Sequence, residues 1–523
     1  MANGTGGNAF ADFLLGIPSA VSQDAPVTGY TNTWYTALFL QDDFRVSQKL
    51  TLNLGLRWDV QTPPTDPFDR VVNYVPGQHS TVNPIAPVGA LFFGDPGVER
   101  GGIPTDYSHL SPRIGFAWDI FGDGKTSLRG GFGIFYGSIS GNEWNTMTNF
   151  QPFSTRLTFT NINQGQNAQG VPLGATLVNP YNNFVGGNPF PYHGTFTTGG
   201  GLFPVAPDFK WPRTYQMNLS IQRQITKDWV VGVAYVGTES RNLPFARDIN
   251  YPVLTPTAST SNILARRPNP LFGAVLLLQS DQSANYHGLQ VTTQMRMSNY
   301  LSFNAFYTFS KTLSGVQLYN STTQGLAQNY TNLAEDKGAG DTDQRHVFNM
   351  SLNFKPDFYH GENGFAKALL NGWSFSPIVK MRSGLPFTIA NGADANLDGV
   401  NTDRAQLVGD PHLDNPTASM WFNTAAFAQN RVITGVAVDG NSARNLLYGP
   451  SYSAVDLAIS REIRFTERYK VSLRGEATNL FNHVNLGQPG ATVPAAGTTS
   501  ASFGVITSAS AMRKLQFGAK FTF

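Results

Sequence analysis

Apolar and polar residues alternate along the last eleven residues of the chain. The residues of one parity are apolar: Leu515, Phe517, Ala519, Phe521 and Phe523. The residues of the other parity are mostly polar: Lys514, Gln516, Gly518, Lys520 and Thr522. A strand with this pattern has one apolar and one polar face. Because aromatic residues at a chain end suit a membrane interface, the pattern predicts the membrane-inserted closing strand of an outer-membrane barrel.

Twelve earlier stretches show the same kind of pattern, although the first is of mixed parity. They are Trp34 to Phe44, Leu50 to Asp59, Arg113 to Ile120, Thr126 to Tyr136, Tyr215 to Gln222, Trp229 to Tyr235, Leu289 to Met295, Leu301 to Phe309, Phe348 to Phe354, Trp373 to Met381, Leu457 to Ile463 and Tyr469 to Leu473. Membrane-spanning strands have about ten residues. The fold class that we expect is therefore all-β, a transmembrane antiparallel barrel with about thirteen strands in this chain.

The connections between these stretches alternate between short turns and long loops. Residues 61–110 and 138–212 show no sustained period and are expected to be long loops. Aromatic residues lie beside most short turns: Phe44, Phe121, Trp229, Tyr300, Phe465 and Tyr469. This asymmetry is typical of barrels with short periplasmic turns, an aromatic girdle and long extracellular loops. Thirteen is odd, whereas a closed single-chain bacterial barrel normally has an even number of strands, so further strands are expected upstream.

The composition fits a membrane sheet better than a soluble domain. Charged residues make up 13% of the chain and aromatic residues 12%, with 53 Gly and 32 Pro. The soluble alternative, a sandwich or propeller, is disfavoured by this low charge and by the very long loops. The longest apolar run, Ala274 to Leu278, is too short to be a spanning helix.

Several functional classes are excluded by what the sequence lacks. There is no Cys, which excludes disulfides and thiolate sites. The net charge is +2 and no basic tract stands out, so nucleic acid is not an expected partner. No nucleophile elbow, metalloprotease motif or phosphate-binding loop is found, and the eight His are scattered. We therefore expect no enzyme, and no cofactor apart from calcium at the loop site discussed below.

The beginning of the chain does not read as an export signal. An apolar patch runs from Phe10 to Ile17, but no Lys or Arg precedes it and Asp12 interrupts it. The expectation is either a signal that lies upstream or a truncated reading frame.

Seven stretches in order along the chain resemble the C-terminal barrel portion of TonB-dependent outer-membrane receptors, specifically the Oar-like branch with a carboxypeptidase-regulatory-like domain. They begin at Ala11, Leu40, Leu54, Ser111, Asp343, Ser383 and Glu476, and read ADFLLG, LQDD, LGLR, SPRIG, DQRHVF, SGLPF and EATNLFNH. The resemblance implies a 22-stranded barrel, of which residues 1–523 would be the C-terminal part. The family's plug, TonB box, regulatory-like domain and signal peptide find no match in this chain.

Charged residues occupy the polar parity of several strands. They include Arg57, Arg113, Arg129, Arg296, Arg474 and Glu476. In a barrel this parity faces the lumen, where a plug or a polar solute could meet these side chains. The alternative is that they only solvate a polar interior.

One loop carries half of a calcium-binding pattern. Asp394, Asn396 and Asp398 supply oxygen at alternate positions, Gly399 follows, and Asp403 lies four residues beyond. The twelfth position, where an EF-hand has Glu, is Ala405, and no helical pattern flanks the loop. The alternative reading is a cluster of turn residues in an extracellular loop.

The function that we expect is TonB-dependent uptake of a large or scarce solute through the cell outer membrane, with recognition by extracellular loops. The alternatives are a passive porin-like channel and a surface-binding or adhesion protein anchored by a barrel. The expected partners are outer-membrane lipid, the barrel-assembly machinery and an unknown solute. TonB-type energy coupling would act only through upstream segments.

Overall fold

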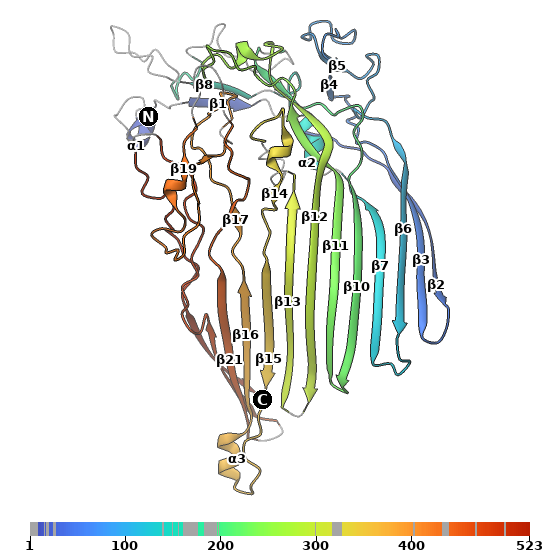
Figure 1. Cartoon of the computed structure of the whole chain (residues 1–523), viewed down its shortest axis with the longest axis vertical. Helices are drawn as coiled ribbons and strands as arrows, with labels where there is room; N and C mark the ends of the chain where they lie inside the picture. The colour runs from blue at the N-terminus through green and yellow to red at the C-terminus, as the bar shows by residue number, and fades with distance from the viewer. Residues whose placement is uncertain are drawn as a thin grey trace.

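A computed structural model gives the arrangement of the chain (Figure 1). It describes residues 9–14, 16, 20–24, 28–138, 141–148, 150–154, 156–160, 176–181, 196, 198–298, 300–315, 327–400, 403–430, 439–465, 468–495 and 498–523. All statements below concern these residues.

One large sheet organises the molecule, and thirteen of its strands follow one another in chain order, each antiparallel to its neighbours. The thirteen strands are β2 (Tyr35–Arg45), β3 (Leu50–Gln61), β6 (Asp106–Asp119), β7 (Thr126–Tyr136), β10 (Arg213–Thr226), β11 (Trp229–Asp248), β12 (Phe272–Ser298), β13 (Leu301–Ser314), β15 (His346–Phe354), β16 (Trp373–Arg382), β21 (Tyr452–Arg464), β22 (Lys470–Thr478) and β23 (Lys514–Thr522). Two short strands, β9 (Gly200–Leu202) and β14 (Gly338–Ala339), pair beside this path with β12 and β13. The predicted fold class and the thirteen strands are confirmed.

The strand register separates an apolar face from a polar face. Leu54 lies opposite Ile114, Ile114 opposite Phe132, and Phe132 opposite Met217, so one row of neighbours across four strands is apolar. The adjacent row consists of Asn53, Gly115, Gly131 and Asn218. Leu54 and Phe132 are each 41% exposed, an arrangement that would be costly in water but is favourable in hydrocarbon.

The first strand of the sheet departs from this order at one position. The sequence of β2 did not show which parity is apolar. The register places Leu38 opposite Trp58 and Leu40 opposite Leu56, so the even-numbered residues of β2 share the apolar face. Asp42 lies opposite Leu54 and therefore has the apolar parity.

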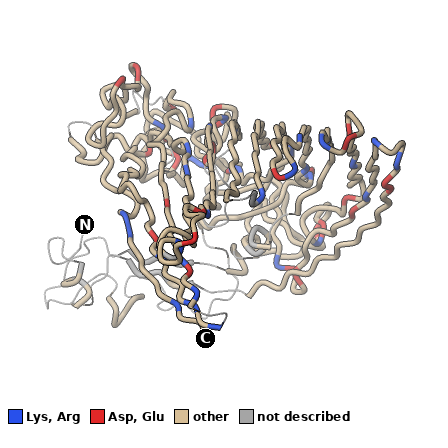
Figure 2. The backbone as a smooth tube through the Cα atoms, turned by 90° about the horizontal axis from the view of Figure 1, so that it is seen from below, with Lys and Arg blue, Asp and Glu red and all other residues tan. Residues whose placement is uncertain are grey.

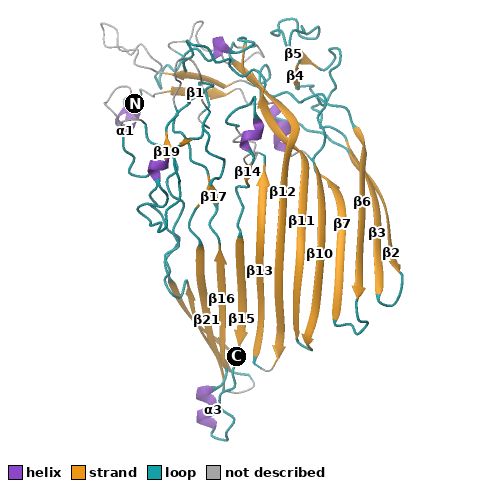
Figure 3. Ribbon diagram, viewed as in Figure 1, coloured by secondary structure: helices purple, strands orange, loops and turns teal. Residues whose placement is uncertain are grey.

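The two ends of the sheet differ, as the sequence predicts (Figures 1 and 3). At the lower end short turns join strands at 46–49, 120–125 and 227–228. Strand β13 follows β12, and β22 follows β21, after only a few residues. In the turn at 120–125, Gly124 has a φ of +71°, a conformation that glycine adopts without strain. The longer connection 355–372 contains α3 (Gly364–Leu370), whose Phe365 is 79% exposed.

We call the long connections at the other end the loop layer, namely the described parts of 62–105, 137–212, 249–271, 315–345, 383–451 and 479–513. It contains the pairs β1 (Ala20–Asp24) with β8 (Arg156–Thr160), β4 (Val72–Tyr74) with β5 (Ala90–Phe92), β17 (Pro386–Phe387) with β20 (Leu447–Tyr448), and β18 (Gln406–Leu407) with β19 (Phe427–Ala428). The helices at this end of the sheet are α1 (Ala9–Leu14), α2 (Gly141–Thr148), η1 (Leu264–Arg266), η2 (Leu333–Asp336) and η3 (Thr424–Ala426). Strand β1 and helix α1 precede the sheet in sequence and lie beside the loop layer at this end (Figure 1).

Buried apolar clusters lie in this loop layer and on the strand ends beneath it. Trp144, Met147 and Phe203 are at most 3% exposed and pack with Leu278 of β12. The stretch 138–212 is one long connection between β7 and β10, as predicted, but its described parts also contain α2, β8 and β9, which the sequence pattern did not indicate. The apolar run Ala274 to Leu278 belongs to an extension of β12 that is covered on both faces by loops, which explains why it does not alternate.

Among the described residues, no helix is both long and apolar enough to cross a membrane. In the same part of the chain, β2 pairs only with β3 and β23 only with β22, so the sheet has two open edges. Seen from below, charged residues are sparse along the tube of the chain (Figure 2).

Candidate functional site

The predicted polar-parity charges all lie on the polar face, but the structure does not gather them into one site. Arg57 donates to Asp59 at 2.7 Å and to the Tyr35 hydroxyl at 2.8 Å. Arg113 lies over the ring of Phe135, with 4.7 Å from its Cζ to the ring centroid. The register places Arg57 opposite Ser111 and Arg113 opposite Gly55, so the two arginines are diagonal neighbours on adjacent strands but have different side-chain partners.

Two of the predicted arginines do approach each other near the short turns. Arg129 and Arg296 line one open hollow of about 320 Å³ together with Lys125 and Lys227. Asp228 is the one acidic residue that lines it. All four cations are exposed to solvent, so this hollow is a positively charged patch of the polar face and not an enclosed site.

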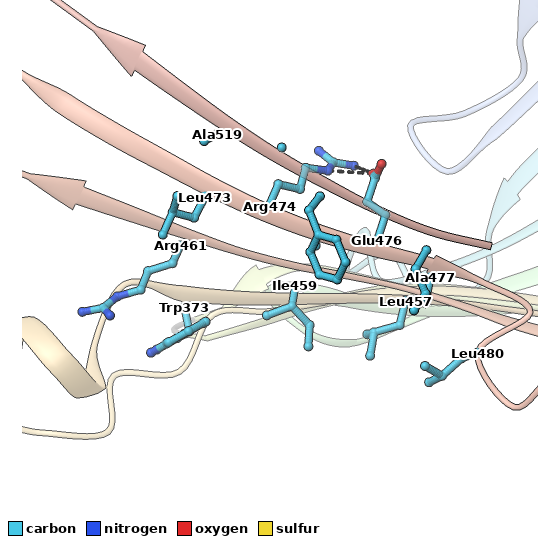
Figure 4. Close-up of a pocket in the computed structure, with 14 residues that line it drawn as sticks. Trp373, Leu457, Ile459, Arg461, Leu473, Arg474, Glu476, Ala477, Leu480 and Ala519 are labelled. Carbon is cyan, nitrogen blue, oxygen red and sulfur yellow. Dashed lines mark hydrogen bonds and ion pairs between the residues drawn. The ribbon is translucent and has the colours of Figure 1, made fainter. Parts of the chain in front are cut away.

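The last predicted pair lies on β22, where Arg474 Nε donates to Glu476 Oε1 at 2.7 Å. It borders a hollow of about 700 Å³ over the closing strands (Figure 4). Leu457 and Ile459 point to the side opposite Arg474 and Glu476 in this view. The hollow is lined mainly by the apolar parity, including Leu515 and Phe517, which suits lipid better than a polar solute.

The predicted calcium residues lie together in the loop layer. Asp394 accepts hydrogen bonds from the backbone amides of Asp398 (3.0 Å) and Gly399 (2.8 Å). Asn396 Oδ1 also accepts from the amide of Asp398 (3.1 Å), and Asp403 accepts from the amide of Ala395 (2.5 Å). Asp398 and Asp403 are each only 2% exposed. Within the described residues, no three acidic or histidine side chains converge closely enough to form a completed metal site.

The electrostatics of this loop reflect buried negative charge. Burial raises the pKa of Asp398 to about 6, and the charge of Asp394 adds to the effect. Burial likewise raises the pKa of Asp403 to about 7, with further contributions from Asp398 and Asp394. The neighbouring Tyr251 phenol has a raised pKa as well, first because it is buried and then because Asp398 is near.

A network of buried polar residues around this loop was not predicted from the sequence. Arg404 forms an ion pair with Asp336, and Arg444 Nη1 lies 3.0 Å from Asp341 Oδ1. Asp343, which is fully buried, accepts from the amide of Thr312 (2.6 Å). In the sequence, one feature pointed to this network: Asp343 begins one of the family-like stretches. Its partners could not be identified because they lie far away in sequence.

The sequence matches a family model described as an outer membrane beta barrel domain over residues 1–516. No curated protein matches it. Among solved structures, the outer membrane transporter YddB from Escherichia coli aligns with a TM-score of 0.46 and 10% identity, over 94% of this chain and 45% of that chain. The FrpB iron transporter from Neisseria meningitidis (F3-3 variant) aligns with a TM-score of 0.44 and 9% identity, over 94% of this chain and 46% of that chain. The ferripyoverdine receptor of Pseudomonas aeruginosa aligns with a TM-score of 0.42 and 10% identity, over 95% of this chain and 40% of that chain. The chain spans less than half the length of each of these proteins.

Proposed function

Because the chain belongs to the outer membrane beta barrel domain family, we propose that it forms part of the wall of a receptor barrel for TonB-dependent uptake of a large or scarce solute. The observation that carries this proposal is the ordered loop layer at one end of a membrane sheet. Its apolar clusters and buried ion pairs hold long loops in defined positions. Loops held in position favour recognition of one solute, because ordering mobile loops on binding would cost affinity.

We also propose that the thirteen strands are the C-terminal part of a 22-stranded barrel of the Oar-like branch. The two open edges, β2 and β23, support this because unpaired backbone groups are costly in hydrocarbon. The strands that complete the wall, the plug and the TonB box would then be contributed by upstream sequence. The encoded sequence before Met1 is the simplest observation to check for these elements.

A transport experiment separates this proposal from its alternatives. The full gene product, placed in an outer membrane, is expected to take up its solute only while the TonB system is energised. Equal leakage with and without energy would favour a passive channel, and binding without uptake would favour a barrel-anchored adhesion protein.

The same proposal predicts the behaviour of residues 1–523 alone. Refolded into liposomes, this chain is expected to show no gated uptake, and any pore that it forms should pass small solutes indifferently. Selective uptake of one solute by these residues, with other solutes excluded, would contradict the assignment of gating and coupling to upstream segments.

A further inference from the structure

One loop of the loop layer carries three carboxylates, and we call Asp394, Asp398 and Asp403 the acidic centre. Within the described residues they do not converge on a completed metal site, but they are near enough to act on one another electrostatically. Asp398 and Asp403 are almost completely buried, whereas Asp394 is partly exposed and leaves the centre open toward solvent. Backbone amides point at all three side chains: those of Asp398 and Gly399 at Asp394, that of Val400 at Asp398, and that of Ala395 at Asp403. The chain thus holds several negative charges in a small volume.

Within the described ranges, no side-chain cation forms an ion pair with these carboxylates. Among the described residues, none of the ion pairs includes Asp394, Asp398 or Asp403. Arg266 approaches the loop but donates to the carbonyl of Leu397, to Asn262 Oδ1 (2.9 Å) and to the carbonyl of Val253 (3.1 Å). Arg404 directs its guanidinium to Asp336 and to the carbonyl of Ser442 (2.8 Å).

One oxygen of the acidic centre also lacks a hydrogen-bond donor. Asp403 Oδ2 accepts from Ala395, but Asp403 Oδ1 is buried and has no hydrogen-bond partner in the part of the chain that the structure describes. Buried carboxylate oxygens nearly always have a hydrogen-bond or metal partner, so one without a partner calls for an explanation, such as a bound ligand. The nearby Asp439 also acts on this region, and its carboxylate accepts from the neutral side-chain amide of Asn329 (2.6 Å).

We propose that the acidic centre binds one Ca²⁺ ion, with ligands from Asp394, Asn396, Asp398 and Asp403. Ca²⁺ takes six to eight oxygen ligands in a flexible geometry, and ionised carboxylates keep free lone pairs after accepting a backbone amide. The missing cation and the orphan oxygen are then explained together. Mg²⁺ would bind less well, because it demands a near-ideal octahedron at shorter distances.

The ion would fasten three loops to one another. Asn396 donates to the hydroxyl of Tyr251 (3.0 Å) and to the carbonyl of Gln328 (3.0 Å), which belong to the connections after β11 and β13. Calcium would therefore stabilise the loop layer as a whole, and this inference stands independently of the solute and of TonB coupling.

Calorimetric titration of the full chain in detergent micelles with CaCl₂ tests the proposal. We expect one saturable site with a Kd of about 10⁻⁴–10⁻³ M, as in extracellular calcium modules, and a higher unfolding temperature in calcium than in EDTA. Asp398→Asn or Asp403→Asn should weaken binding at least about tenfold, since each removes a charged ligand. Each should also unfold in EDTA at the same or a higher temperature than the parent chain, because a buried charge has been removed.

Asp410→Asn is the matched control, since Asp410 lies in the same connection but its side chain is 80% exposed and pairs with His412. It should leave calcium binding unchanged. Absence of saturable binding to the parent chain would overturn the proposal, and so would equal binding by the Asp398→Asn, Asp403→Asn double variant. Either result would mean that protons, not a metal ion, neutralise the acidic centre.

Discussion

Arg404 and Asp336 form an ion pair in which both side chains are only 5% exposed. The pair joins the connection after β16 to the connection after β13, across 68 positions of sequence. Burial raises the pKa of Asp336, although the charge of Arg404 acts in the opposite direction. The pair is therefore held by its surroundings as much as by its own attraction, and each partner depends on the other for compensation.

Replacing Arg404 with Met should destabilise the loop layer by about 3–5 kcal/mol, because the carboxylate of Asp336 would remain buried without a cation. Hydrogen exchange of the amides in 327–345 and 403–407 measures this loss. The control is Arg100→Ala, which breaks a pair with Asp69 whose side chains are 48% and 37% exposed and should cost about 0–1 kcal/mol. Similar costs for the two variants would show that the Arg404 pair is not structurally important.

Asp95 organises the connection between β3 and β6. Its carboxylate accepts from the Ser80 hydroxyl (2.7 Å), the Thr81 amide (2.7 Å) and the Phe92 amide (2.8 Å), and the residue is 3% exposed. Burial alone would raise its pKa, but the hydrogen bonds, led by that of Ser80, outweigh burial and lower the pKa. The ionised form is therefore the one that stabilises the folded loop.

The sign of the pH dependence follows from this lowered pKa. The stabilisation by Asp95 is fully present above its unfolded-state pKa of about 3.9 and is lost as the pH falls toward its folded-state pKa. Asp95→Asn should cost about 1–3 kcal/mol at neutral pH, because an amide nitrogen would face amide donors. Hydrogen exchange of residues 80–95 between pH 3 and 7 tests both points. An unchanged pH profile in the Asp95→Asn chain would contradict them.

The closing strand ends in stacked aromatic rings. The rings of Tyr469 and Phe521 are 6.0 Å apart and nearly parallel at 5°. Phe521→Ala should remove about 0.5–1.5 kcal/mol beyond the loss of buried area and lower the yield of refolding into vesicles. Thr522→Ala, on the polar parity, is the control and should refold as the parent does. Equal yields for both variants would argue against a role of Phe521 in insertion.

An Arg scan of neighbouring positions probes the two faces energetically. Leu219 lies opposite Tyr235 on the apolar face and is 50% exposed, while Asn218 lies on the polar face. Leu219→Arg should lower the free energy of unfolding in vesicles by about 2–4 kcal/mol, and Asn218→Arg by much less. The same comparison applies to Leu54 against Asn53 and to Phe517 against Gln516.

Alternation of apolar and polar residues was enough to predict the thirteen long strands of the sheet, because each of them has one face in lipid and one in a polar medium. Thr126 to Tyr136 was predicted with the bounds that the structure shows. The upper parts of β11 and β12 were missed, since loops cover both faces there and Val275 and Leu278 are fully buried. Parity also assigned Arg57 and Arg296 to the polar face, but it carries no information on the distance between them. Contacts such as that of Arg404 with Asp336 depend on how distant loops fold, which no local pattern records.

Site-specific spin labelling tests the central claim, that the sheet spans a membrane with Leu219 outward, most directly. The chain has no Cys, so a single Cys introduced at position 218 or 219 carries the only label. In lipid vesicles, a nitroxide at position 219 should collide often with oxygen, which concentrates in hydrocarbon, and rarely with a water-soluble nickel complex. A label at position 218 should show the opposite preference. Equal accessibility at the two positions, or the reverse order, would contradict the membrane sheet and its register.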